Sequence, residues 1–385
     1  MNSHAVKSKS RKSRVPASAG KRQLPMWPYF SASDIAMVKR VLESGKVNYW
    51  TGGAGIRFEK AFAEWSGAKY AFAVSSGTAA LHLALESLGV GEGDEVICTP
   101  YSFRASATAA QNAGAKVVFA DVGRDHMLDA ETIAPRITAR TKAIVVVHLY
   151  GQVAEMGPIL KLARKHGIKV VEDCAQCLGG EYCGVKTGLL GDAGCFSFCQ
   201  NKHITCGGEG GMIVCKSSFV AKNIRSLRDH GWIPGSSPKR YDRIGYNFRM
   251  TEMQSVLGLG QLARLDSWNL PRRRALAKRF INALAPSPLI VALPVDTAQR
   301  RASFYLVPFV LDKTKLKVSV PKFIEALQAE TACAYRILWP LMSDEPVAAS
   351  LLSCTVGFWV HPVYSRKIVD EAVKAFYRMA SLYSK

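Results

Sequence analysis

The sequence predicts an α/β protein with a mostly parallel central sheet sandwiched by helices, followed by a smaller α+β domain. Two observations lead to this fold class. Apolar segments of strand length alternate with helical periodicity between residues 70 and 171, which is typical of a parallel sheet covered on both faces. Near Pro271 the pattern changes to helices around one long apolar strand. A chain of 385 residues with 48% hydrophobic content is long enough for two domains.

The elements are expected in the following order. Ser31 and Asp34 cap a first helix, which ends at Gly45, and a second helix covers 58–65. We then expect strands at 70–74, 95–98, 116–120, 143–148, 168–171 and 193–198, a helix from Thr78 to Leu88, and an amphipathic helix around Arg225 and Arg228. The C-terminal part is expected to hold a strand at 303–311 and helices at 321–330 and 368–382. The predicted division is a tail at 1–24, a large domain at 25–270 and a small domain at 271–385.

The net charge of +21 is unevenly distributed. Seven Lys and Arg residues precede the first acidic residue, Asp34, in a stretch with too few apolar side chains to fold. We therefore predict a disordered basic tail. Nucleic-acid binding is the alternative use of this tail, and we do not expect it, because aromatic residues are not interleaved with the basic ones. A basic body is suited to attract an anionic substrate.

Cysteine usage and hydropathy indicate a cytoplasmic protein. Seven of the ten cysteines lie between Cys174 and Cys215, along predicted strands where small buried residues pack well. Because the compartment is expected to be reducing, we expect no disulfides among them. Metal binding by Cys174, Cys177 and Cys183 is the alternative, but no second correctly spaced pair follows, and we expect no metal. The chain also lacks an apolar run of the roughly 20 residues that span a membrane and the apolar segment of a signal peptide.

A glycine-rich turn carries the strongest candidate for chemistry. Ser197 lies near the end of the apolar run 193–198, and Lys202 follows five residues later, ahead of the glycines at 207–211. An ammonium group is rarely buried without a reason. Burial of Lys202 would lower the pKa of its amine, which a nucleophilic lysine that forms a Schiff base requires. A solvated lysine without chemistry is the alternative interpretation.

Two further segments place polar groups after strands. Asp173 and Gln176 follow one apolar strand, and Gly77 and Thr78 lie between another strand and the helix after it. The amino end of that helix would bind an anion. In sheets of this kind ligands bind at the carboxyl ends of the strands. Lysine, carboxylate and anion site together fit pyridoxal phosphate, which needs partners for its aldehyde, its pyridine nitrogen and its phosphate.

These motifs resemble the DegT/DnrJ/EryC1/StrS family of sugar aminotransferases over residues 25–385, with further matches at 99–106, 148–151 and 245–254. The resemblance implies the fold type I architecture of aspartate aminotransferase and pyridoxal 5'-phosphate as cofactor. It implies amino transfer from glutamate or glutamine to an anionic, nucleotide-linked keto sugar in polysaccharide, glycan or secondary-metabolite biosynthesis, lipopolysaccharide included. It also implies a homodimer whose subunits share their active sites.

The resemblance gives each candidate residue a role. Lys202 holds the cofactor and moves the proton, Asp173 pairs with the pyridine nitrogen, and Gln176 contacts the ring oxygen. Phe103 stacks on the pyridine face, with core packing as its alternative, and Asn247, otherwise a turn residue, reaches the phosphate of the neighbouring subunit. The other phosphate ligands are Gly77, Thr78 and Ser197.

Two features test the family match. One residue more than the commonest family spacing separates Lys202 from Glu209; we expect the glycines to absorb it, with the position of Glu209 left open. Sugar dehydratases of the family carry histidine in place of the lysine, so Lys202 favours amino transfer. The alternatives are the same site acting on a keto-inositol or another carbocycle, a sugar dehydratase, and a regulator that binds the cofactor without turnover.

Overall fold

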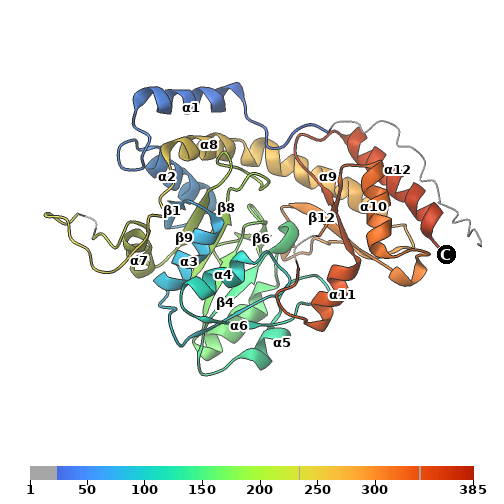
Figure 1. Cartoon of the computed structure of the whole chain (residues 1–385), viewed down its shortest axis with the longest axis horizontal. Coiled ribbons are helices and arrows are strands. Elements are labelled where there is room, and N and C mark those ends of the chain that lie inside the picture. Colours follow the sequence, from blue (N-terminus) through green and yellow to red (C-terminus); the bar gives the residue numbers. More distant parts are fainter. Residues whose placement is uncertain (1–23, 234, 338–339) are drawn as a thin grey trace, which may run out of the picture.

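The centre of the molecule is a seven-stranded sheet of order β1-β9-β8-β5-β4-β2-β3 (Figure 1). In this computed structural model the described residues are 24–385 without 234 and 338–339, so the predicted basic tail lies outside them except for Leu24. Strands β8, β5, β4, β2 and β3 are parallel, whereas β9 runs antiparallel to both β8 and β1. The predicted mostly parallel sheet is confirmed, with an antiparallel strand that the sequence analysis did not identify.

Six of the seven strands of this sheet lie within two residues of the predicted segments, and β9 is the strand that was not predicted. The seven strands are β1 (Tyr70–Val74), β2 (Glu95–Cys98), β3 (Lys116–Phe119), β4 (Thr141–Val147), β5 (Lys169–Asp173), β8 (Ala193–Ser197) and β9 (Gly211–Cys215). The helices around it are α1 (Ala32–Ser44), α2 (Ala54–Ser66), α3 (Gly77–Ser87), α4 (Ala105–Asn112), α5 (Ala130–Ile133), α6 (Met156–His166), α7 (Ser218–Arg228) and α8 (Glu252–Ala263). In the described part of the chain, no helix is both long and apolar enough to span a membrane.

Apolar side chains form separate cores on the two faces of the sheet. One core lies under α3, α4 and α7 and includes Val145 of β4. On the other face, Val146 packs with α6, while Phe58 and Phe62 of α2 pack with residues of β1, β8 and β9. Because successive strand residues point to opposite faces, neighbours on β4 belong to different cores. Both faces of the sheet are thereby buried, as a parallel sheet requires.

The C-terminal part contains a second, antiparallel sheet of order β10-β12-β14-β13. Its elements are α9 (Leu270–Leu284), β10 (Ile290–Ala292), β12 (Leu306–Leu311), α10 (Val320–Glu330), β13 (Ala334–Arg336), α11 (Pro346–Cys354), β14 (Thr355–Trp359) and α12 (Arg366–Tyr383), gathered on one side of the molecule in Figure 1. A third sheet joins the two parts, because β11 (Arg300–Arg301) pairs with the hairpin of β6 (Glu181–Tyr182) and β7 (Val185–Lys186). The domain boundary at residue 271 stays a prediction, and Pro271 lies in the first turn of α9.

The first helix shows how a buried charge fixes one element to another. Ser31 and Asp34 form the predicted capping box of α1, and Gly45 ends the helix in a left-handed conformation. The fully buried Asp34 carboxylate also accepts from Arg264, with 2.6 Å between Oδ2 and Nη2. This pair joins α1 to the end of α8.

Replacing Arg264 by Met should lower the melting temperature. Burial alone would raise the pKa of Asp34, but hydrogen bonds from Arg264 and Ser31 hold it below its usual range. Such a carboxylate contributes stability above its unfolded pKa of about 3.9, and this stability is lost as pH falls through the lowered folded pKa. Removing Arg264 leaves Asp34 buried with fewer partners, at a cost of about 2 kcal/mol.

Thermal melts from pH 7 to pH 3 measure this effect. Met in place of Lys39, whose pair with Glu43 is exposed, is the matched control and should melt like the wild type. Identical melting temperatures for Arg264→Met and the wild type at pH 7 would contradict the expectation.

Candidate active site

The carboxyl ends of β1, β5 and β8 meet at one edge of the sheet. Since β9 is antiparallel to both β1 and β8, these two strands run in the same direction, which is also that of β5. Asp173 is the last residue of β5, Ser197 is the last residue of β8, and Gly77 begins α3 soon after β1 ends. The sequence therefore brings its predicted carboxylate and anion-binding residues to the edge where ligands bind in such sheets.

Close backbone contacts shape a cradle at the amino end of α3. A Cβ atom at Gly77 would lie 2.7 Å from the Cβ of Ser197, and one at Gly211 would lie 2.4 Å from the carbonyl oxygen of Ser76. The hydroxyl of Ser76 caps the helix by accepting from the amide of Ala79 at 3.1 Å. The amide groups of the first turn, Thr78 included, are thereby brought beside Ser197. Amides at a helix amino end and a hydroxyl are suitable ligands for a phosphate.

The Asp173 carboxylate is buried and held by two neutral donors. The Ser106 hydroxyl donates to Oδ2 at 2.8 Å, and the amide of Ala175 donates to Oδ1 at 3.0 Å. Next to it, Gln176 Oε1 accepts from the amide of Tyr150 at 2.9 Å. Tyr150 has φ +60°, a left-handed conformation that costs free energy in a residue other than glycine. Both predicted residues are therefore fixed in orientation before any ligand binds.

Lys202 is partly buried, and its amine lies 5.0 Å from the centre of the Tyr305 ring. Burial lowers the pKa of this amine, and the nearby carboxylates, Asp173 first and then Glu209, oppose the shift. Asp173 is thus close enough to act on Lys202 electrostatically. A lysine with a lowered pKa is neutral over a wider pH range, which a nucleophile needs.

The remaining two candidates are exposed. Phe103 is 58% exposed and lies one turn before Ser106, whose amide donates to its carbonyl at 3.4 Å. Asn247 is also exposed, while the carbonyl of the next residue, Phe248, accepts from the amide of Ser75 at 2.8 Å. Asn247 therefore lies beside the loop that leads into α3. Core packing does not explain Phe103; its stacking role and the phosphate role of Asn247 stay predictions.

The sequence analysis did not identify Ser106 or Tyr305 and gave Tyr150 no role. Ser106 lies three positions after Phe103. A helical turn after Phe103 would place both residues on the same side of the helix, and this spacing was the signal that could have identified Ser106. Tyr305 lies 103 positions from Lys202, directly before β12 of the second sheet, and no local pattern connects the two.

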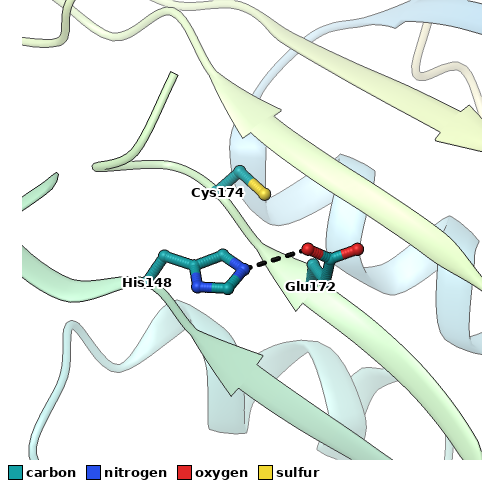
Figure 2. Close-up of side chains that lie close together, drawn as sticks. All are labelled: His148, Glu172 and Cys174. Atoms are coloured by element: carbon teal, nitrogen blue, oxygen red, sulfur yellow. Dashed lines mark hydrogen bonds and ion pairs between the residues drawn. The ribbon is translucent and has the colours of Figure 1, made fainter. Parts of the chain in front are cut away.

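A buried cluster of His148, Glu172 and Cys174 lies near the ends of β4 and β5 (Figure 2). His148 Nδ1 accepts from the amide of Ala154 at 3.1 Å, so Nε2 carries the proton and donates to Glu172 at 3.0 Å. Glu172 also accepts from three amides in the segment 188–191, at 2.7–2.8 Å. Burial raises the pKa of the Cys174 thiol well above its usual range, so it stays protonated. Hydrogen bonds already use the nitrogen and oxygen atoms of His148 and Glu172 that would bind a metal ion, and we expect none here.

Replacing Glu172 by Gln should destabilise the protein, whereas a chelator should not. The amide nitrogen of Gln donates and would face donors that now bind a carboxylate oxygen, which costs about 3 kcal/mol or less per group. The melting temperature of the variant should fall by several degrees, and that of the wild type should be the same with EDTA or with added zinc. A melting temperature that falls with EDTA would show that the cluster holds a metal.

A lysine, an aspartate and a helix-capped anion cradle on this sheet define the fold type I class of enzymes that use pyridoxal phosphate. Residues 28–354 match the model of the DegT/DnrJ/EryC1/StrS aminotransferase family, and the chain belongs to this family. The predicted family and fold class are confirmed.

Three similar proteins illustrate the family. The GDP-perosamine synthase of Caulobacter vibrioides is 46% identical over 224 residues, which are 57% of this chain and 59% of that protein. The L-glutamine:2-deoxy-scyllo-inosose aminotransferase of Streptomyces lividus is 36% identical over 328 residues, 81% of this chain and 77% of that protein. The X-ray structure of an aminotransferase from Psychrobacter cryohalolentis superposes with a TM-score of 0.87 at 34% identity and covers 94% of this chain and 99% of its own.

Proposed function

We propose that the protein transfers an amino group from glutamate or glutamine to the keto group of an anionic, nucleotide-linked sugar, with pyridoxal phosphate as cofactor. The observation that carries this proposal is Lys202, a partly buried amine of lowered pKa within electrostatic reach of Asp173. Membership of an aminotransferase family supports the reaction class. Similarity to a GDP-perosamine synthase supports the substrate class.

The residues present fit the cofactor. The cradle of Gly77, Thr78 and Ser197 offers donors to a phosphate, and Asp173 offers a fixed carboxylate to a pyridine nitrogen. Lys202 would hold the aldehyde carbon. When bound, pyridoxal phosphate supplies an electron sink for the substrate carbon that loses a proton.

The side chains of the chain itself contribute proton transfer and electrostatics. Once released from the cofactor, the Lys202 amine would take the proton from the carbon that carries the amino group of the donor. It would then deliver this proton to the cofactor carbon that the lysine had held. The lowered pKa of Lys202 favours both transfers near neutral pH. Asp173, held by Ser106, stabilises positive charge at the ring nitrogen without having to reorient. Gln176, fixed by the amide of Tyr150, would contact the ring oxygen.

The basic surface suits an anionic sugar. Of the net charge of +21, seven charges lie in the N-terminal tail, and the remaining +14 would raise the local concentration of a diphosphate-linked substrate. A keto-inositol is the second candidate, because one relative is named as an inosose aminotransferase. It would use the same site and would show no preference for a nucleotide.

Replacing Lys202 by Ala should abolish amino transfer and the visible absorbance of the bound cofactor, without changing the melting temperature of the apoprotein by more than a few degrees. The wild type, given glutamate or glutamine, should convert at least one member of a panel of nucleotide-linked keto sugars, measured by mass spectrometry of the amino sugar. Turnover by Lys202→Ala would refute the assignment. Conversion of a keto-inositol but of no nucleotide sugar would favour the second candidate.

A homodimer with shared active sites gives a separate prediction. If Asn247 reaches the phosphate in the neighbouring subunit, mixed dimers of Lys202→Ala and Asn247→Ala have one site with both lesions and one with neither. Random reassociation makes half of the dimers mixed, so activity should return to about a quarter of the wild-type value. Asn247→Ala alone should mainly lose cofactor affinity.

Mixing Lys202→Ala with Asp173→Ala is the matched control. Both of these residues serve the site of their own subunit, so every site keeps a lesion and mixing should restore nothing. An equally inactive mixture of Lys202→Ala with Asn247→Ala would show that Asn247 serves its own subunit or none.

A further inference from the structure

Three consecutive arginines, Arg272 to Arg274, lie near the start of α9. Two of them bind carbonyl oxygens of distant segments. Arg272 donates to Pro362, and Arg274 donates to Ala302 at 3.0 Å and to Gly179 at 2.8 Å. These contacts fasten α9 to both parts of the molecule and explain the two residues as structural. The third, Arg273, has different surroundings.

Arg273 is fully buried and donates to neutral groups. Its Nε lies 2.7 Å from Asn269 Oδ1, its Nη1 lies 3.4 Å from the Tyr305 carbonyl oxygen, and its guanidinium lies 5.2 Å from the centre of the Trp27 ring. Burial lowers the pKa of Arg273 to about 9. A buried cation that binds an amide and a carbonyl instead of a carboxylate is costly, and it needs a reason beyond stability.

The two side chains that Arg273 contacts both bind the backbone of the active-site turn. A guanidinium only donates, so Asn269 must turn its oxygen toward Arg273, and its amide nitrogen then donates to the His203 carbonyl. The indole of Trp27 donates to the Lys202 carbonyl at 3.2 Å. Two successive carbonyls, those of Lys202 and His203, therefore accept from groups that Arg273 orients.

Two buried histidines complete the cluster. His203 Nε2 lies 3.3 Å from the Ser303 carbonyl and must donate to it, and His361 stacks on Trp27 with ring centres 5.6 Å apart. Burial first, and the charge of Arg273 second, lower the pKa of both, so both are neutral. Among the described residues, His203 Nδ1, His361 Nδ1 and Arg273 Nη2 have no hydrogen-bond partner. Trp27, Asn269, His203 and His361 are all neutral, so Arg273 is the charged member of this cluster.

We propose that Arg273 is a positioning residue for Lys202. It orients Asn269 and holds Trp27, and these two bind the carbonyls of the two successive peptides that directly follow the Lys202 Cα. The inference rests on the proposed role of Lys202 as the cofactor-binding lysine. Its consequence is kinetic, because a displacement of about 1 Å at a reacting group can cost about a hundredfold in rate.

The test uses the full chain with Arg273→Met and Trp27→Phe, and Arg274→Met as the matched control. Phe keeps a ring that can stack on His361 but cannot donate to the Lys202 carbonyl. Apoprotein is incubated briefly with pyridoxal phosphate and reduced with borohydride, and the labelled peptide is quantified by mass spectrometry. Labelling of Lys202 should slow about tenfold in Arg273→Met and severalfold in Trp27→Phe, with kcat falling in parallel and KM for the amino donor within about twofold.

The melting temperature of Arg274→Met should fall about as much as that of Arg273→Met, but its Lys202 should be labelled at the wild-type rate. Trp27→Phe keeps the inference testable if Arg273→Met does not fold. Wild-type labelling at a lysine other than Lys202 would overturn the proposed function. Labelling of Lys202 that is equally fast in the wild type, Arg273→Met and Trp27→Phe, or equally slow in Arg274→Met, would overturn this inference alone.

Discussion

The candidate site depends on the carboxylate of Glu172, which accepts hydrogen bonds from four donors on the segments next to β5. Glu172 and Asp173 are neighbours on β5 and point to opposite sides of it. Glu172 holds the amides of 188–191, the segment that leads into β8 and so to Ser197. It also holds His148, whose own amide donates to the Asp173 carbonyl at 3.1 Å. One buried charge thus sets the relative position of the acid and the phosphate cradle.

Two buried arginines show how differently a cation can be accommodated in this fold. Arg228 pairs with Glu59 and Tyr49 and donates to the carbonyl of Ala73; burial lowers its pKa, but these partners outweigh burial and raise it. That residue fastens α7 to β1 and is explained by stability. Arg273 has no carboxylate partner, among the residues that the structure describes, to offset its burial, and its pKa is therefore lowered. The contrast is the physical ground for giving Arg273 a role in placing Lys202.

The sequence predicted what local pattern determines. Apolar runs and the residues directly after them predicted six of the seven strands of the central sheet and placed Asp173, Ser197 and Gly77 at one edge of it. The predicted strand 303–311 instead begins at Leu306, because Ser303 and Tyr305 bond to the backbone of Gly151 and Tyr150 at the site. Contacts between distant residues leave no such pattern. Trp27 binds a carbonyl 175 positions away, and Ser106 binds Asp173 67 positions away.

The glycine-rich turn after Lys202 serves two physical requirements, of which the sequence analysis named one. Gly207 and Gly208 have φ of +87° and +141°, which other residues avoid, and the Cβ position of Gly208 has no neighbour within 4 Å. An extra residue is easily accommodated at such an open position. Gly211 is required for a different reason. A side chain there would clash with the carbonyl oxygen of Ser76, the residue that caps α3. Added length is therefore tolerated in the first half of the turn, while the second half is held against α3 by contact.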